Sequence, residues 1–98
     1  MLLTKEDRQR LPGLNSQENE ADPKIPVKFF NPEGSWTWYA IEFDGEDTFF
    51  GLVDGFEKEL GYFSLAELAA YRGSFGLGIE RDRYWDPSTR LSAVRGAP

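Results

Sequence analysis

Residues 36–53 read WTWYAIEFDGEDTFFGLV, and this stretch decides the fold. Aromatic and β-branched residues, which favour strands, fill 36–43 and 48–53, and residues 44–47 between them are typical turn residues. We therefore expect two strands joined by a hairpin turn. Because successive side chains of a strand point to opposite faces, the first strand should carry Thr37, Tyr39, Ile41 and Phe43 on one face, and Trp36, Trp38, Ala40 and Glu42 on the other. Both faces carry large apolar groups, so one should pack on helices and the other should be at least partly covered.

The neighbouring segments extend this hairpin into a longer sheet. Residues 27–30 (VKFF) are expected to form a preceding strand, joined to it by the turn 31–34 (NPEG). After a turn at Asp54-Gly55, residues 60–63 should form a fourth strand, and 79–85 a fifth. Gly51 and Gly61 inside strands indicate bulges or a close approach of two backbones. The predicted fold class is therefore α+β, with a four- to five-stranded, mainly antiparallel β-meander packed against one or two short helices.

Three helical segments are expected around the sheet. Thr4 can cap the amide of Asp7 at the start of a short helix that Pro12-Gly13 ends. Ser64 and Glu67 form a capping-box pattern before a helix over 65–72, which Gly73 terminates. Asp86-Pro87 is expected to open a final helical turn that runs through Val94.

The chain is expected to be a single domain over residues 1–98, because its length is close to that of one typical domain. It divides into an N-terminal helix and extended arm (1–26), a β-meander (27–63), a helix (64–73), and a C-terminal strand and tail (74–98). The last residues are expected to fray.

Composition excludes several kinds of chemistry. The chain of 98 residues contains no cysteine and no histidine, so it has no disulfide, no thiolate metal site, and no histidine base or zinc ligand. We expect no cofactor and no catalysis. The opening residues carry no signal-peptide pattern, and no apolar run approaches the roughly 18 residues that span a bilayer. A cytoplasmic location without membrane contact is therefore expected.

The charges are segregated along the chain, whose net charge is −6. Residues 31–70 hold nine acidic residues and one basic residue. An acidic surface repels nucleic acid and attracts basic protein surfaces. We predict that a partner protein binds an acidic face made of Glu42, Asp44, Glu46, Asp47, Asp54, Glu57 and Glu59.

Other binding surfaces are open alternatives. Trp36, Trp38 and Tyr39 could form an aromatic binding face or a homodimer contact, although each is more often a core residue. Arg81, Arg83 and Trp85 combine bases with an aromatic ring, as in single-strand nucleic-acid sites, but the net charge opposes such binding.

A small carboxylate-based enzyme is a further alternative. The turn 44–47 could hold a divalent cation, and Glu42 with Glu57 could act as an acid–base pair. The turn lacks the spacing of a known calcium loop, so a solvated hairpin turn is favoured.

Several of these segments together resemble a known family. They are LLTKEDR (2–8), SQEN (16–19), VKFF (27–30), WTWY (36–39), EFDGEDTFFGLV (42–53), ELGYFSL (59–65) and IERD (79–82). In these segments the chain closely resembles the bacterial family called domain of unknown function 2958. That resemblance implies no activity and assigns no residue a role. It implies a context on plasmids, integrative elements and phages, beside anti-restriction genes. Together with the acidic middle, it leads us to expect a protein-binding inhibitor of a host defence system, of the anti-restriction or anti-CRISPR kind.

Overall fold

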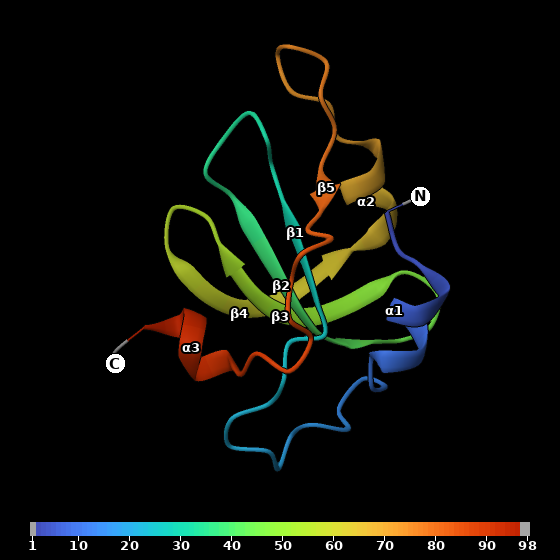
Figure 1. The fold of residues 1–98 in the computed structure, drawn as a ribbon, viewed down its shortest axis with the longest axis vertical. Helices are drawn as coiled ribbons and strands as arrows, with labels where there is room; N and C mark the ends of the chain where they lie inside the picture. Colours follow the sequence, from blue (N-terminus) through green and yellow to red (C-terminus); the bar gives the residue numbers. More distant parts are fainter. Residues whose placement is uncertain (1, 97–98) are drawn as a thin grey trace.

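The computed structural model describes residues 2–96 and contains a five-stranded antiparallel sheet in the order β4-β3-β2-β1-β5 (Figure 1). The strands are β1 (Val27–Phe30), β2 (Thr37–Phe43), β3 (Thr48–Asp54), β4 (Lys58–Ser64) and β5 (Glu80–Arg81). The helices are α1 (Lys5–Arg10), α2 (Leu65–Ala70) and α3 (Leu91–Arg95). The predicted α+β fold with a β-meander is confirmed. The predicted fraying of the tail concerns residues 97–98 among others, and these two lie outside the described residues.

A β-bulge changes the predicted facing of β2. Its register against β3 shifts between Ala40 and Glu42, so that Ile41 has no partner of its own. The extra residue reverses the alternation beyond it. Phe43 therefore joins the face that carries Ala40, and Glu42 moves to the face that carries Ile41, opposite to our expectation for both.

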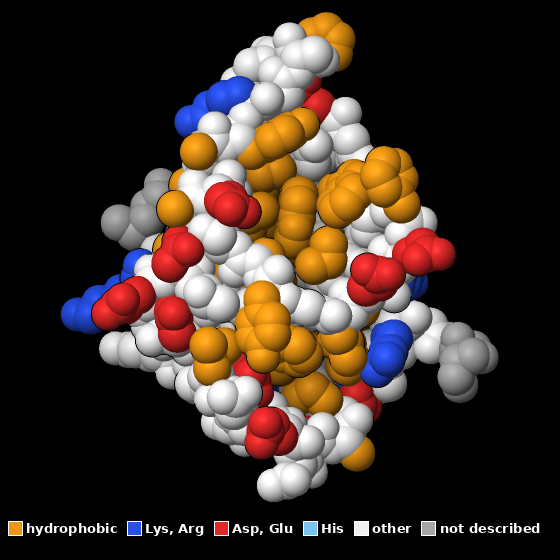
Figure 2. Space-filling model, turned by 180° about the vertical axis from the view of Figure 1, so that it is seen from behind, with side chains coloured by type: hydrophobic (Ala, Val, Ile, Leu, Met, Phe, Trp, Pro, Cys, Tyr) orange, Lys and Arg blue, Asp and Glu red, His pale blue; other side chains and the backbone are white. Residues whose placement is uncertain are grey.

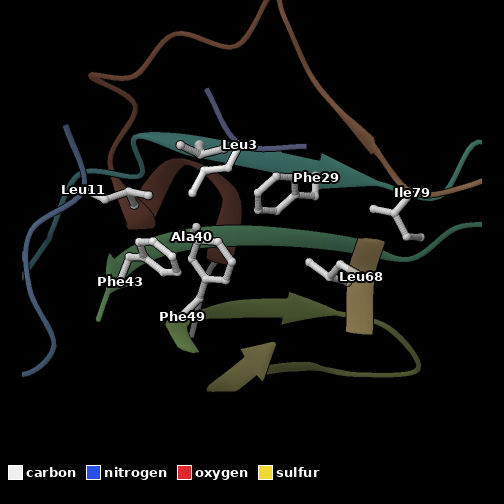
Figure 3. Packing of buried hydrophobic residues seen from close by; sticks show 9 residues of the cluster. Leu3, Leu11, Phe29, Ala40, Phe43, Phe49, Leu68 and Ile79 are labelled. Atoms are coloured by element: carbon white, nitrogen blue, oxygen red, sulfur yellow. The ribbon is translucent and has the colours of Figure 1, made fainter. Parts of the chain in front are cut away.

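Both faces of the sheet are covered, and each has its own core. We call one the α2 face; its core residues are Leu3, Leu11, Val27, Phe29, Ala40, Phe43, Phe49, Leu68 and Ile79 (Figure 3). The opposite side, the α3 face, packs Ile41 and Leu52 against Ile25 and Leu91. In Figure 1, α1 and α2 lie on the right of the sheet and α3 lies on the left. Burial of each large side chain contributes roughly 1.5–3 kcal/mol.

The two predicted helix starts are present, with one change of partner. Thr4 and Asp7 form a reciprocal capping box at α1. At α2 the Ser64 hydroxyl accepts a hydrogen bond from the amide of Glu67 as predicted. The carboxylate that completes this cap belongs to Asp47 and not to Glu67. It accepts hydrogen bonds from the Ser64 hydroxyl at 2.6 Å and from the amide of Ala66 at 2.7 Å.

The C-terminal quarter differs most from expectation. β5 covers two residues and not 79–85, because its only partner β1 is itself four residues long. The last helix begins at Leu91, whose side chain packs on the α3 face. Asp86 instead forms a local turn, in which its carboxylate accepts hydrogen bonds from the amide and hydroxyl of Ser88.

None of the helices within residues 2–96 is both long and apolar enough to cross a membrane.

Candidate binding groove and surface charges

The predicted acidic residues do not form one face. Asp44, Glu46 and Asp47 lie at the β2–β3 turn, whereas Asp54, Glu57 and Glu59 lie around the β3–β4 turn. These turns are at opposite ends of the seven-residue strand β3, a separation of about 20 Å. The predicted residues therefore form two separate acidic groups, one at each end of β3.

Two of the carboxylates in the first group serve the backbone. Asp44 accepts hydrogen bonds from the amides of Glu46, Asp47 and Thr48 at 2.8, 2.8 and 3.1 Å. These hydrogen bonds hold the pKa of Asp44 below its usual value. Asp47 caps α2. In the part of the chain that the structure describes, no group of three or more metal-ligating side chains is close enough to hold an ion.

Glu42 is not a surface residue. Its side chain lies on the α3 face, the residue is 4% exposed, and its two oxygens accept the amides of Asn15 and Gln17, each at 2.9 Å. Glu42 thus fastens the N-terminal arm across the sheet. It can belong neither to an exposed acidic face nor to an acid–base pair with the exposed Glu57. Its burial was not predicted because the amides that it accepts belong to the arm, 27 and 25 residues earlier in the sequence.

Of the three residues predicted to bind nucleic acid, Arg81 and Trp85 have structural roles and Arg83 is exposed. Arg81 is paired with the buried Asp7 through Nε at 2.5 Å and Nη2 at 2.9 Å. Trp85 packs against Tyr39 and donates its Nε1 hydrogen to the carbonyl of Ile25 at 2.7 Å. Arg83 is exposed and lies over the ring of Tyr84.

A hollow of about 1010 Å³ lies beside the segment that carries these residues. Arg72, Arg81 and Arg83 line it together with Glu80 and Asp82, and Trp85 does not. Arg72 already donates to the carbonyls of Ala69 and Tyr71. The acids and the existing bonds leave little uncommitted positive charge for a phosphate backbone.

Trp36 and Trp38 lie on the α2 side of the sheet, and Tyr39 lies on the α3 side, as the alternation predicts. The rings of Trp36 and Trp38 are 6.1 Å apart between centroids. Tyr39 packs against Trp85, and burial together with the nearby charge of Asp54 raises the pKa of its hydroxyl. Tyr39 is therefore half-buried against the core of the α3 face and does not share a binding surface with the two tryptophans.

The two tryptophans line a groove of about 340 Å³ between α2 and the sheet. We call it the aromatic groove; its apolar lining is Trp36, Trp38, Phe63, Leu68, Tyr71 and Ile79. Asn31, Ser64 and Glu67 place polar atoms in it, and the Asn31 amide donates to the Tyr71 hydroxyl at 3.4 Å. This combination of an apolar lining with a few polar groups is typical of ligand and side-chain binding sites.

Trp36 connects the groove to the β3–β4 turn. A Cβ atom on Gly55 would lie 2.5 Å from the Trp36 ring, so the ring packs directly on this glycine. The exposed ring of Phe56 meets Trp36 edge-on, with centroids 5.3 Å apart. Glu57 follows Phe56 and therefore lies near this end of the groove. From behind, the molecule has hydrophobic side chains in the middle and acidic side chains on both sides of them (Figure 2).

Sequence reasoning found the tryptophans but missed the rest of this lining. Leu68 and Tyr71 are three residues apart, a helical spacing that puts both on one side of α2 and its C-cap. Phe63 shares a face of the sheet with Trp38, which the strand alternation implies once the register is known. Ile79 comes from a segment that no local pattern connects to the groove.

Comparison with known proteins gives one result. No curated protein and no solved structure matches the chain. A family model described as "Protein of unknown function (DUF2958)" matches residues 2–97, which is nearly the whole chain. The chain therefore belongs to the DUF2958 family of proteins of unknown function.

Proposed function

We propose that this protein is a non-enzymatic, protein-binding accessory whose contact surface is the aromatic groove. The observation that carries the proposal is the pair Trp36 and Trp38, set side by side in an apolar hollow with polar groups at its margin. Tryptophan and tyrosine in such positions dominate the binding energy of protein interfaces. A partner would insert an apolar side chain into the groove.

Charge supports a basic partner. Glu67 lies in the groove, and Glu57 and Glu59 are exposed near its Trp36 end. Carboxylates at the margin of an apolar contact steer a basic surface toward it and select against acidic ones. The narrower proposal, an inhibitor of a host restriction or CRISPR complex carried on a mobile element, rests on this charge and on the family context. DNA-binding enzymes carry basic surfaces that fit such a margin.

The nucleic-acid alternative has less support, because Arg81 and Trp85 are both engaged within the fold. The metal-dependent enzyme alternative has less support because Asp44 and Asp47 accept backbone amides.

The test is affinity capture with mass spectrometry from the native host, using three baits. These are the wild type, the groove variant Tyr71→Ala, and the control Phe75→Ala, which removes a ring that is 86% exposed and outside the groove. We expect a partner that the wild type and Phe75→Ala retain and that Tyr71→Ala loses. Retention of the same proteins by all three baits would contradict a role for the groove.

A second pair of baits tests the charge. Glu57→Lys should weaken capture and reduce its salt dependence. Glu46→Lys, at the far end of β3, is the matched control and should have a smaller effect. Equal losses would mean that net charge matters and position does not.

A further inference from the structure

Strand β4 forms an open edge of the sheet. It pairs with β3 on one side, and no strand of residues 2–96 pairs with its other side. The hydrogen bonds at its two ends fix which groups face outward. Gly55 donates to the carbonyl of Glu57 at 3.1 Å, and Leu65 donates to the carbonyl of Asp47 at 2.8 Å.

These bonds continue the β3–β4 ladder by one residue at each end, and on the β4 side both engage odd-numbered residues, Glu57 and Leu65. Because hydrogen-bonded and non-bonded pairs alternate along an antiparallel ladder, Glu59, Gly61 and Phe63 also bond to β3. The backbone N–H and C=O groups of Lys58, Leu60 and Tyr62 therefore point away from the sheet. This row of outward-pointing groups is what a further strand needs for pairing.

Most of the usual protections against edge pairing are absent from the centre of β4. Open edges are normally blocked by proline, by a bulge, by charged side chains or by a covering segment. The charged residues Lys58 and Glu59 lie at the first end of β4, where the Lys58 ammonium group donates to the carbonyl of Val94 at the end of α3. β4 has no proline, and its register with β3 is continuous over all seven residues. Its central side chains are also apolar and accessible, with Leu60 38% and Tyr62 63% exposed.

Hollows on both faces of the sheet adjoin this edge. On the α2 face Phe63 lines the aromatic groove, and no atom lies within 4 Å of the position that a Gly61 Cβ would take. On the α3 face Leu60, Tyr62 and Leu91 line a second hollow of about 430 Å³, together with polar residues of the N-terminal arm such as Glu18 and Glu20. An added strand would find a largely apolar hollow for its side chains on the α2 face and a mixed one on the α3 face.

The surrounding charge identifies the occupant. Glu57 and Glu59 stand at one end of the edge, and Asp47 and Glu67 at the other. Lys58 lies between the first two, but its ammonium group donates to the carbonyl of Val94, so three carboxylates outnumber it at the two exposed ends even without Asp47. A second copy paired antiparallel about Gly61 would bring the carboxylates of one end against those of the other. Like charges so placed oppose pairing, whereas a segment with basic ends and an apolar centre would be attracted.

We propose that the β4 edge binds an extended segment of a partner protein as a sixth strand, with apolar residues at the centre of the segment and basic residues at its ends. This deepens the proposed function, on which it rests, by giving the mode of binding and the chemistry of the bound segment. The added strand would form backbone hydrogen bonds with Leu60 and Tyr62 and would send side chains toward both hollows.

The test uses the full chain and a seven-residue synthetic peptide, the length of β4, with three central valines and two lysines at each end. Backbone amide exchange is followed by NMR. In the free protein Leu60 and Tyr62 should exchange quickly, and peptide should slow them while Gly61 and Phe63, already bonded to β3, change little. A peptide with glutamates in place of the lysines should bind at least about tenfold more weakly.

Two variants separate backbone from side-chain binding. Leu60→Pro removes an outward N–H without removing a bond to β3, and should weaken peptide binding about tenfold or more. Leu60→Ala keeps that N–H and should have the smaller effect. The exchange pattern of the wild type decides the question independently if Leu60→Pro folds poorly.

Three results would overturn strand addition. The first is peptide binding that shifts the Trp36 and Trp38 indole signals but leaves the Leu60 and Tyr62 amides unchanged. That result would support binding at the aromatic groove and refute strand addition at β4. The second is concentration-dependent protection of these amides without peptide, which would show that a second copy occupies the edge. The third is the absence of any shift, which would also count against a basic partner for the groove.

Discussion

Gly51 and Gly61 stand opposite each other in neighbouring strands, and we predict that alanine has opposite effects at the two positions. At Gly51 a Cβ atom would lie 1.9 Å from the backbone carbonyl oxygen of Tyr39, next to the bulge. Nonbonded contacts below 3.0 Å are not tolerated, so the backbone of β2 or β3 must move by about an ångström. At Gly61 the same atom would enter open space.

The magnitude follows from the bonds that such a shift breaks. Displacing β3 from β2 leaves one or two buried backbone groups without partners, at about 1–3 kcal/mol each. Gly51→Ala should therefore cost about 1–6 kcal/mol of unfolding free energy, and the middle of that range is about 2–4 kcal/mol. For a domain of this size that is a fall in Tm of roughly 10–30 °C. Gly61→Ala should be neutral or stabilising by up to about 1 kcal/mol, because it restricts the unfolded chain.

The assay is urea unfolding of both variants followed by tryptophan fluorescence, with thermal circular dichroism as a second probe. Similar midpoints for Gly51→Ala and wild type would refute the claim that the bulge forces the two backbones into contact. If Gly61→Ala lowered the free energy of unfolding as much as Gly51→Ala, any side chain at this pair of positions would disturb the sheet.

Three further predictions concern carboxylates. Burial alone would raise the pKa of Asp7, but the hydrogen bonds from Arg81 and Thr4 outweigh it and lower the pKa below the usual 3.8. The lowered pKa contributes folding stability above pH 3.8, and this contribution is lost as the pH falls through the folded-state pKa. Because Arg81 is partly exposed, Asp7→Asn should cost about 2 kcal/mol at neutral pH, the value of a hydrogen bond to a charged group, and it should lessen the acid dependence of the urea midpoint. Glu42→Gln leaves one of the two arm amides without its acceptor, which should lower the free energy of unfolding by about 1–3 kcal/mol. Hydrogen exchange of the Asn15 and Gln17 amides, followed by NMR, should become faster. Unchanged exchange would mean that the arm is held by other contacts. Asp47→Ala should destabilise more than Ser64→Ala, which costs about 1 kcal/mol. Each variant removes two of the hydrogen bonds that start α2, but both of those lost in Asp47→Ala are accepted by a charged carboxylate, and such bonds are the stronger ones. A larger destabilisation by Ser64→Ala in thermal melts would show that Ser64 is the main cap.

The elements that the sequence predicted well are those that local pattern determines. Residues 36–53 form their hairpin because the alternation of side chains, β-propensity and a DGED turn all favour it. Helix α1 begins directly after its N-cap Thr4, because the residues that form the cap are neighbours in the sequence. The errors occur where a distant contact decides. The bulge at Ile41 depends on a close approach between β2 and β3, and the start of α3 depends on Leu91 reaching the α3 face. The aromatic groove was not predicted for the same reason. Its lining comes from segments that are distant in the sequence, namely β2, β4, α2 and the loop before β5.

The acidic composition misled the functional reading for a related physical reason. A short chain with long irregular segments has many backbone N–H groups outside helices and strands, and each buried one needs an acceptor. Glu42 accepts two of them from the arm, and Glu33 accepts those of Phe75 and Leu77 at 2.6 and 2.8 Å. Some of the carboxylates that the sequence analysis assigned to the surface therefore hold loops in place by accepting their backbone amides. Those that stay exposed beside Trp36 and along β4, chiefly Glu57 and Glu59, are the ones that a partner can meet. The charge argument for a binding role thus becomes local, and it applies to the same end of the sheet as the aromatic groove and the open strand edge.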